Sequence, residues 1–482
     1  MLFTGVDIGG TNTDIAIVDG GVLTRKVPND AGLKRALDSL EIRGRLAVST
    51  SQPLNRLVTG RPSSVHSITI PGPGLPSPGS VAGMVNHRGD VLEEIDPAAI
   101  RVVLEEQVSE YLAICGKFSV RNPALEEQVK AIALSYYPPG RVATSHGLAR
   151  LGFPARRVTT EVNARILEIV AEMTRTISPY ARDFLFFKGD GGLTSAGAVL
   201  QNPSVLFNSS PAAVALGARY LSGRSDCLVV DIGGTTTDLV PLHNGAPRMQ
   251  DIRIDGNITF IRSIQAVNIP FGGDSVIETD LCPRREGNPM AFGGVRPTLT
   301  DALNCCGASI GDATRSRSMD PAIAEQAVRE YISGVSEEVH ASGAEIIVGT
   351  GYLAGHLIPE ISREAGVRCI IPEHADCANA IGVAVSRVSL SLWVHMDTGK
   401  GRMVINGDLM RIDQDMDDDE LIAWCKEEVR RRAVEMGAPE EDVADVSLEY
   451  FHAYDVVRYG RRTERIADLQ VSIAPGITVD AE

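Results

Sequence analysis

The sequence lacks several features that mark whole classes of protein. Aromatic residues make up only 5% of the 482 positions, and no run of about 18 apolar residues occurs, so we expect no transmembrane span. The formal net charge of −16 leaves no basic excess for a nucleic-acid or anionic-membrane partner. With 44% hydrophobic and 22% charged residues, the composition is typical of a globular protein with several domains.

Metal-binding and secretion signals are also missing. None of the eight cysteines forms a C-x₂-C pair, and no secretory signal precedes the first apolar run, which predicts a reducing, cytoplasmic location. The nine histidines show no H-x-x-x-H spacing, so the sequence gives no case for zinc. The adjacent pair Cys305 and Cys306 is interpreted as packing residues.

What the sequence does contain is an eight-residue segment that occurs twice. Asp7–Asp14 (DIGGTNTD) returns as Asp231–Asp238 (DIGGTTTD), 224 positions later (231 minus 7), with Asn12 replaced by Thr236. An apolar run precedes and follows each copy, so each is predicted to form a strand, a glycine-rich turn and a second strand. An ordinary tight turn would explain one copy, but it does not explain a duplicated octet.

The chemistry of both turns suits a nucleotide phosphate. Glycines let successive backbone N–H groups converge on an anion, and threonines add hydroxyl groups. Asp7 and Asp231 end buried strands, where a carboxylate is costly unless it serves a cation, and Mg²⁺ between them would satisfy both. The predicted phosphate-binding residues are Gly9, Gly10, Thr11, Asn12 and Thr13 in the first copy, and Gly233, Gly234, Thr235, Thr236 and Thr237 in the second.

Other nucleotide motifs are absent, but a third glycine-rich turn is present. No Lys-Ser/Thr follows a glycine-rich loop and no G-x-G-x-x-G opens a helix, which excludes a P-loop and a Rossmann fingerprint. The apolar run at 345–348 leads into Gly349, Thr350 and Gly351, a predicted strand-to-helix turn. Because it follows two phosphate turns, these three residues are expected to lie along an adenosine.

The remaining patterns predict alternating strands and helices, as an α/β fold requires. Asp96-Pro97, Asn122-Pro123 and Asp320-Pro321 are helix-start signals, and an apolar stripe predicts a helix over 159–177. From about residue 394 the sequence changes character. A helix starting near Asp417 and strands over 446–457 and 464–473 predict a small α+β module.

Two phosphate hairpins followed by an adenosine loop resemble the actin-like ATPase architecture of sugar kinases, Hsp70 chaperones and actin. Within that group, the sequence resembles the A component of the hydantoinase/5-oxoprolinase family, which also includes acetone carboxylase subunits. Further segments fall in the family's order: Thr50–Gly60 with Asn55, Glu161–Arg165, Gly191–Ser195, Ser209–Ala213, Pro297–Asp301 and Val348–Gly355. The sequence departs from the family at Val48–Thr50, at Ser210 and at Gly272–Asp274, near the expected substrate pocket.

The resemblance implies an α/β fold with two actin-like (ribonuclease H-like) ATPase domains around a nucleotide cleft. The expected divisions are 1–180 with inserted segments, 181–393, and a C-terminal α+β module over 394–482. The implied activity is ATP-dependent hydrolysis of a hydantoin- or 5-oxoproline-type cyclic amide through a phosphorylated intermediate. ATP and Mg²⁺ would be the cofactors, with Asp7 and Asp231 as metal-binding residues.

Several points stay open in this interpretation. Asp190 and Asp274 are candidate acid/base residues, whereas Asp14 and Asp238 are interpreted first as hairpin carboxylates. A carbonyl-activating carboxylase subunit, a small-molecule kinase and an ATPase switch acting on a partner protein are the alternative functions. The missing C-x₂-C pairs count against activators that carry iron–sulfur clusters. A second hydantoinase-type subunit and homo-oligomerisation are the expected assemblies.

Overall fold

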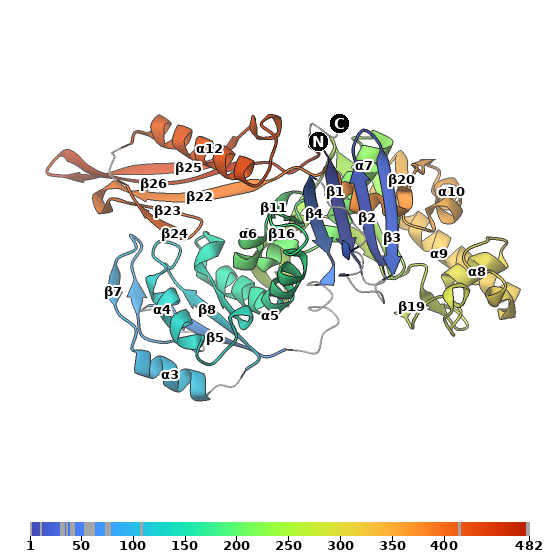
Figure 1. The fold of residues 1–482 in the computed structure, drawn as a ribbon, viewed down its shortest axis with the longest axis horizontal. Helices are drawn as coiled ribbons and strands as arrows, with labels where there is room; N and C mark the ends of the chain where they lie inside the picture. The colour runs from blue at the N-terminus through green and yellow to red at the C-terminus, as the bar shows by residue number, and fades with distance from the viewer. Residues whose placement is uncertain are drawn as a thin grey trace.

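The structure is a computed structural model that describes residues 2–9, 12–28, 34, 37–38, 44–52, 63–72, 79–106, 109–412 and 416–478. Figure 1 shows an elongated molecule with two sheets and their helices in one half. In the other half, the C-terminal sheet lies over an inserted subdomain. No helix in the described part of the chain is both long and apolar enough to cross a membrane.

The first octet lies in a six-stranded sheet with the order β11-β10-β4-β1-β2-β3. Strands β1, β2 and β3 form an antiparallel meander, while β4 runs parallel to β1 and β10 runs parallel to β4. The strands are β1 Phe3–Ile8, β2 Asn12–Val18, β3 Val22–Pro28, β4 Arg45–Thr50, β10 Leu185–Phe187 and β11 Leu193–Ser195.

The second octet lies in a sheet that repeats this topology. Strands β12, β13 and β17 form the meander, β20 runs parallel to β12, and β21 runs parallel to β20. The strands are β12 Cys227–Ile232, β13 Thr237–His243, β14 Ala246–Pro247, β17 Val267–Ile269, β20 Ile346–Thr350 and β21 Arg368–Ile370. The same topology thus occurs twice, once around each octet, and β10 and β11 belong to the first sheet although the expected division placed residues from 181 onward in the second domain.

Two helices cross between the sheets. Helix α7 (Ser209–Ser222) packs against the second sheet, and α11 (Ala378–Val385) packs against β1 and β2 of the first sheet. A Cβ on Gly217 would lie 1.8 Å from the Ala378 carbonyl oxygen, and a Cβ on Gly382 would lie 1.8 Å from that of Ala213. Only glycine therefore permits this crossing, which joins the cores of both halves.

An inserted subdomain separates β4 from β10. Its parallel sheet β5-β8-β9 is covered by three helices, one of which, α5, also packs against the hairpin β15-β16. The predicted helix starts are correct, since Asp96 Oδ1 accepts from Ala98 N and Asn122 Oδ1 accepts from Ala124 N. The elements are β5 Val65–Ile70, β6 Met84–Val85, β7 Val91–Glu93, α3 Pro97–Glu106, β8 Tyr111–Gly116, α4 Ala124–Ala133, β9 Val142–Thr144, α5 Phe153–Ile177, β15 Met249–Ile254 and β16 Asn257–Ile264.

A helical region follows the second meander and forms one end of the molecule in Figure 1. Residues 284–294 include the end of β19 and a short turn of 3₁₀ helix at Met290–Phe292. The helix predicted to start at Asp320-Pro321 is capped by Asp320 and continues to Ser342. Helix α6 (Ala196–Gln201) follows β11 of the first sheet, and the elements after the second meander are β18 Ser275–Ile277, β19 Leu281–Arg285, α8 Leu299–Cys305, α9 Pro321–Ser342 and α10 Ala354–Ala365.

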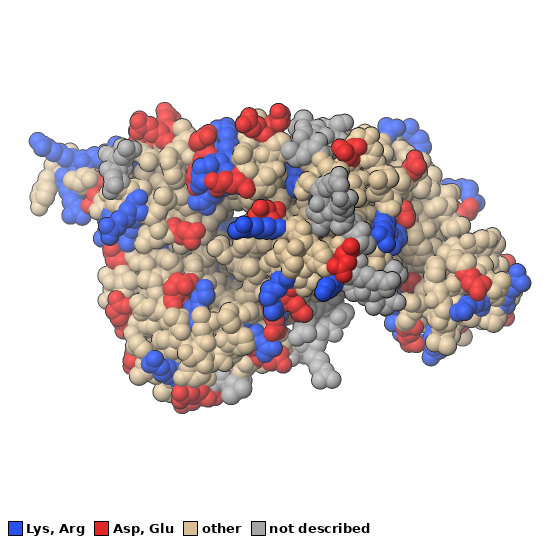
Figure 2. Space-filling view, in the orientation of Figure 1, with Lys and Arg blue, Asp and Glu red and all other residues tan. Residues whose placement is uncertain are grey.

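The C-terminal region is an antiparallel sheet with the order β24-β23-β22-β26-β25, covered by α12. Helix α12 begins with a capping box between Asp417 and Glu420, close to the predicted start. On the face shown in Figure 2, acidic and basic side chains are interspersed over the described residues. The elements are β22 Leu390–Asp397, β23 Arg402–Ile405, β24 Asp408–Arg411, α12 Asp418–Glu435, β25 Ser447–Arg458 and β26 Arg461–Ile473.

Candidate nucleotide site

The two glycine-rich turns are closed by the same backbone hydrogen bond. Gly9 N donates to Asn12 O at 3.0 Å, and Gly233 N donates to Thr236 O at 3.0 Å. Strand pairing ends at Ile8–Thr13 in the first copy and at Ile232–Thr237 in the second, so each turn spans four residues. Gly10 and Thr11 lie outside the described residues, and their phosphate role stays a prediction.

Each turn is preceded by a carboxylate that a hydroxyl group holds from the neighbouring parallel strand. The register places Asp7 beside Ser49 on β4, and Asp231 beside Thr350 on β20. Ser49 Oγ donates to Asp7 Oδ1, and Thr350 Oγ1 donates to Asp231 Oδ1 at 2.7 Å. Thr350, expected along the adenosine, is thus the positional equivalent of Ser49.

The carboxylates of the two halves are close enough to influence one another. Burial raises the pKa of Asp7 to about 6, while Ser49 and Asn379 act against this and the charges of Asp14 and Asp231 add to it. Burial also raises the pKa of Asp231, which Lys26 lowers and Asp14 raises further. The carboxylates beside the two turns are therefore close enough for their charges to interact, as the duplicated octets predict.

Two residues outside the motifs, Asn379 and Lys26, contact the carboxylates of the first copy. At the start of α11, Asn379 Nδ2 donates to Asp7 Oδ2 at 2.6 Å and to Asp14 Oδ2 at 3.2 Å. Lys26 Nζ lies 3.1 Å from both carboxylate oxygens of Asp14 and 2.5 Å from the carbonyl of Asp376. Pairing β3 with β2 in the sequence would have placed Lys26 opposite Asp14, but no local signal points to Asn379, 372 positions from Asp7.

The second copy has an amide where the first has the lysine. Asn268 pairs with Asp238 as Lys26 pairs with Asp14, and Asn268 Nδ2 donates to Asp238 Oδ1 at 2.6 Å. Burial and then the charge of Asp231 raise the pKa of Asp238 to about 7, although the amide lowers it. Asp238 therefore has a hydrogen-bonded amide as its cross-strand partner where Asp14 has a cation.

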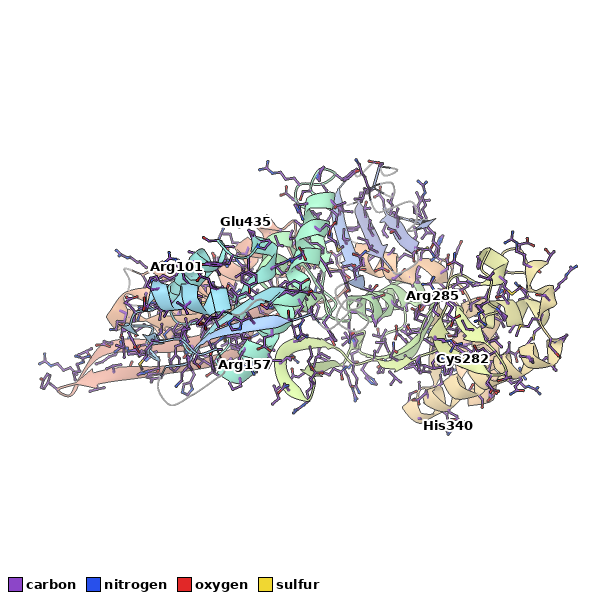
Figure 3. All side chains as sticks on the ribbon, turned by 90° about the horizontal axis from the view of Figure 1, so that it is seen from below. Arg101, Arg157, Cys282, Arg285, His340 and Glu435 are labelled. Carbon is purple, nitrogen blue, oxygen red and sulfur yellow. The ribbon has the colours of Figure 1, made fainter. Side chains whose placement is uncertain are left out.

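The loop at 271–275 lies against the second turn. Gly273 N donates to Gly233 O at 2.9 Å, and Asp274 N donates to Gly234 O at 2.6 Å. The Asp274 carboxylate lies 3.1 Å from Arg285 Nε, and Figure 3 shows Arg285 between the second sheet and the α8–α9 region. Burial raises the pKa of Asp274, whereas Arg285 lowers it. The candidate acid Asp274 thus lies beside a phosphate turn.

The side chain of the other candidate acid, Asp190, contacts residues of its own loop. Its carboxylate lies 2.7 Å from Lys188 Nζ and accepts from Gly192 N at 2.9 Å. No hydrogen bond or ion pair within the described residues joins Asp190 to either turn. Its loop follows β10, at the same end of the first sheet as Asp7. The catalytic role of Asp190 stays a prediction.

The third glycine-rich turn is closely packed. A Cβ on Gly349 would lie 2.4 Å from Ile358 of α10, and a Cβ on Gly351 would lie 2.2 Å from the Ile232 carbonyl. Gly351 also has a φ of 88°, which favours glycine. The two glycines therefore hold the β20–α10 turn directly beside the second phosphate turn, while their adenosine contact stays a prediction.

The threonines of the second turn differ in exposure. Thr235 is exposed and Thr236 is half-buried, so both are accessible to a ligand. Thr237 is fully buried, its Oγ1 donates to the Phe271 carbonyl at 2.8 Å, and it lies 2.5 Å from Tyr331 Oη. The hydroxyl of Thr237 therefore anchors the 271–275 loop.

The buried carboxylates fit Mg²⁺ bound through a nucleotide. Within the described ranges, no group of three or more His, Cys, Asp or Glu side chains is placed to hold a metal without further ligands. Mg²⁺ commonly takes one or two protein carboxylates and completes its shell with water and phosphate oxygens. Asp7 and Asp231 meet that requirement, because a cation between them would relieve both burial and mutual repulsion.

Comparisons with known proteins agree with this geometry. Residues 156–312, which include the second octet, match the family model described as hydantoinase/oxoprolinase. The structure is similar to nucleotide-free acetone carboxylase (TM-score 0.70, 17% identity, 100% of this chain and 83% of that chain). It is also similar to the ATP-dependent caprolactamase from Pseudomonas jessenii (TM-score 0.61, 19% identity, 97% of this chain and 87% of that chain). No match was found among curated proteins. The expected resemblance and fold are confirmed.

Proposed function

We propose that this chain is an ATP-dependent enzyme that opens a small cyclic amide of the hydantoin or 5-oxoproline type. The observation that carries the proposal is the pair of glycine-rich turns, each preceded by a carboxylate that accepts a hydroxyl hydrogen bond and is influenced by charges of the other half. The hydantoinase/oxoprolinase match over residues 156–312 supports the substrate class.

The chemistry explains why ATP would be needed. An amide carbonyl resists water, so its oxygen attacks the γ-phosphorus and the bond to ADP breaks. Water then adds to the activated carbon, the C–N bond breaks, and the ring nitrogen leaves as an amine after protonation. A second water cleaves the resulting acyl phosphate, which gives a carboxylate and phosphate. Such phosphoryl transfer depends on positioning and charge neutralisation more than on covalent catalysis.

The residues of both halves have distinct roles in this proposal. The two turns bind the phosphates, and the β20–α10 turn with Gly349, Thr350 and Gly351 lies along the adenosine. Asp7 and Asp231 would hold Mg²⁺, which supplies charge neutralisation at the phosphates when bound. Ser49, Thr350 and Asn379 orient these carboxylates. We favour Asp274 over Asp190 for proton transfer, because Asp274 packs on the second turn.

A carbonyl-activating carboxylase subunit is the second candidate. It is favoured by the structural similarity to acetone carboxylase, which extends over the whole chain. In that case the phosphorylated carbonyl compound would pass to a second component, and this chain would be one subunit of a larger enzyme. Homo-oligomerisation is part of both proposals.

The decisive experiment measures ATP cleavage by the purified chain with hydantoin, 5-oxoproline, a larger lactam and small ketones. We expect stimulation by a cyclic amide, with the open-chain amino acid, ADP and phosphate as products by mass spectrometry. Stimulation by ketones alone would move the assignment to the carboxylase subunit. A stable phosphate ester would indicate a small-molecule kinase, and stimulation only by a partner protein would indicate an ATPase switch.

A further inference from the structure

A second cavity lies away from the phosphate turns, where the inserted subdomain meets the C-terminal sheet. It has a volume of about 260 Å³, near the lower end of the range for small-molecule sites. One wall comes from residues 120–121 and 149–151, and the other comes from strands β22, β23, β25 and β26. The polar and aromatic residues in its lining are Arg121, Arg150, Trp393, His395, Tyr450 and Asp468.

Arg150 is the distinctive group in this lining. Its guanidinium lies 4.3 Å from the ring centre of Phe260 and 5.7 Å from that of Trp393, and it has no carboxylate partner within the described residues. Arg156 Nη1 donates to the Arg150 carbonyl at 3.0 Å, and Ala149 has a left-handed φ of 56° that alanine seldom adopts. Contacts on ring faces leave the N–H edge of a guanidinium available for a carboxylate.

The acidic group in the cavity is already neutralised by protein donors. Asp468 Oδ1 accepts from Arg121 Nη1 and lies 3.0 Å from His395 Nδ1. With two arginines and one aspartate, the lining has an excess of one positive charge (2 − 1). His395 and Arg121 are 6% and 8% exposed, yet His395 Nε2 and Arg121 Nε have no hydrogen-bond partner among the residues that the structure describes. The lining therefore has unused polar groups and does not repel an anion.

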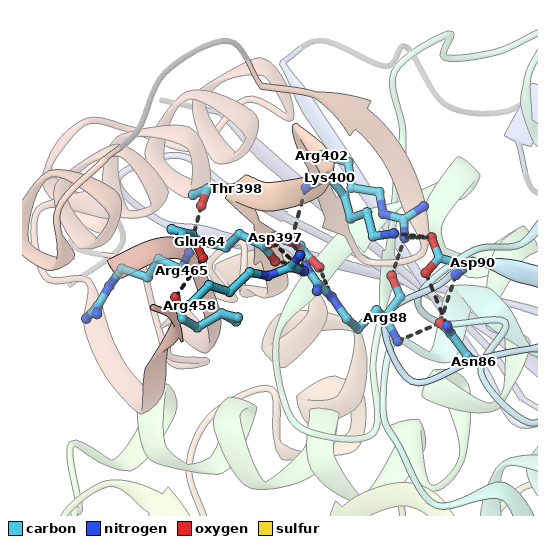
Figure 4. A network of polar contacts seen from close by, with 12 residues as sticks. Asn86, Arg88, Asp90, Asp397, Thr398, Lys400, Arg402, Arg458, Glu464 and Arg465 are labelled. Atoms are coloured by element: carbon cyan, nitrogen blue, oxygen red, sulfur yellow. Dashed lines mark hydrogen bonds and ion pairs between the residues drawn. The ribbon is translucent and has the colours of Figure 1, made fainter. Parts of the chain in front are cut away.

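Ion pairs hold the two walls together. Arg88 makes a bidentate pair with Asp397 at 2.8 and 2.7 Å and also contacts Glu464 at 2.6 Å. Lys400 Nζ lies 2.9 Å from Asp90. Figure 4 shows this network linking the inserted subdomain to the C-terminal sheet, and Asp397 is only two positions beyond His395 on β22. The cavity is therefore largely formed before a ligand arrives.

We propose that this cavity binds a small monocarboxylate with a flat or apolar body. The carboxylate takes a charge-assisted, bidentate pair with Arg150, and the body packs between Trp393, Tyr450 and the aliphatic side chains around them. The proposal goes beyond the nucleotide site and does not depend on the reaction assigned to it.

Isothermal titration calorimetry tests this proposal with benzoate and hexanoate against their neutral isosteres, benzamide and hexanamide. We expect the carboxylates to bind at least about tenfold more tightly than the amides. Arg150→Met keeps the aliphatic stem between the rings and should lose this preference, whereas Arg150→Lys should retain part of it. Arg253→Met, at an exposed position on β15, is the matched control and should bind like the wild type.

A second variant tests the cavity without changing its charge. Leu151 is 50% exposed in the lining, and Leu151→Trp should fill the space and weaken benzoate binding with an unchanged melting temperature. Absence of binding to the wild type, equal binding of acids and amides, or full binding by Arg150→Met would overturn the proposal. Competitive displacement of benzoate by a non-hydrolysable ATP analogue would also overturn it, because it would place the carboxylate in the nucleotide site.

Discussion

The two halves share one backbone plan but differ in how they neutralise their carboxylates. In the first, Asp14 faces Lys26, and Asp7 accepts from Ser49 and Asn379. In the second, Asp238 faces the amide of Asn268, and Asp231 accepts from the hydroxyl of Thr350. In the first copy a lysine thus pairs directly with an octet carboxylate, whereas no cation of the described residues pairs directly with Asp231 or Asp238.

The crossing helices show the same asymmetry. The reciprocal contacts of Gly217 and Gly382 make these glycines equivalent, so Asn379, three positions before Gly382, corresponds to Val214, three positions before Gly217. Helix α11 therefore brings an amide to the first turn, and α7 has valine at the matching position. The difference indicates that the second half relies more on a cation that arrives with the nucleotide.

The largest effect is expected where the two halves cross. Gly217→Ala and Gly382→Ala each place a methyl group within 1.8 Å of a carbonyl oxygen in the opposite helix. Each should destabilise the protein by at least about 4 kcal/mol or prevent folding. Urea unfolding followed by circular dichroism measures this. Gly334→Ala in α9 is the control, because no atom lies within 4 Å of its added Cβ. A normal midpoint for either crossing variant would show that the helices do not pack this way.

The next largest effect is expected on turnover. Asp7→Ala and Asp231→Ala should each reduce Mg²⁺-dependent ATP cleavage by at least about 100-fold with the fold intact. Because no cation of the described residues pairs directly with Asp231 or Asp238, Asp231→Ala should raise the Mg²⁺ concentration for half-maximal nucleotide binding more than Asp7→Ala does. Fluorescent-nucleotide titrations at several Mg²⁺ concentrations measure this. Equal Mg²⁺ requirements would contradict the asymmetry, and retained turnover in both variants would remove their metal role.

A smaller effect is expected on the pH dependence of stability. The folded-state pKa values of Asp7 (about 6) and Asp238 (about 7) lie above the ordinary value of 3.8, so the folded nucleotide-free protein holds more protons between these values than the unfolded chain. Its free energy of unfolding should therefore fall as pH rises from about 4 to about 7. In Asp7→Asn, the free energy of unfolding should fall by about 1–3 kcal/mol less over this pH range than in the wild type. Thermal unfolding of the wild type and of Asp7→Asn across this pH range measures the difference. The same pH dependence in both proteins would contradict a buried Asp7 carboxylate without a neutralising partner.

The smallest effect is expected from making the first half resemble the second. Lys26→Met removes the cation beside Asp14 and should weaken nucleotide binding by about three- to tenfold at low Mg²⁺, with recovery at high Mg²⁺. Asn268→Lys is the reciprocal change. It should lower the Mg²⁺ requirement, because it gives Asp238 the partner that Asp14 already has. Shifts of the same sign in the two variants, or no shift in either, would contradict the comparison in nucleotide titrations.

The repeated octets made the central part of this fold predictable. Each octet specifies a strand pair and its turn, and flanking apolar runs placed β1, β2, β12 and β13 correctly. Asp96, Asn122 and Asp417 also gave correct helix starts, because side-chain caps are local. Strands, turns and helix starts that depend on neighbouring residues were therefore predictable from the sequence.

Other parts depend on distant contacts. The parallel strand Val65–Ile70 of the inserted sheet contains the polar residues His66 and Thr69, both of which are buried. Because of these residues, the sequence pattern does not indicate a buried strand here. The role of Asn379 follows from the helix crossing, which no local pattern encodes, whereas the role of Lys26 follows from the register of β3 on β2. The segment with Asn55 lies outside the described residues. The exposure of turn threonines likewise depends on packing, as the burial of Thr237 against Tyr331 shows.

The most direct test of a shared nucleotide site is a double-mutant cycle on its two carboxylates. Binding of a Mg²⁺-loaded, non-hydrolysable ATP analogue is measured by calorimetry for the wild type, Asp7→Asn, Asp231→Asn and the double variant. The account predicts a single analogue per chain and non-additive losses, with a coupling energy of at least about 1 kcal/mol. Two analogues per chain, or fully additive losses, would contradict it.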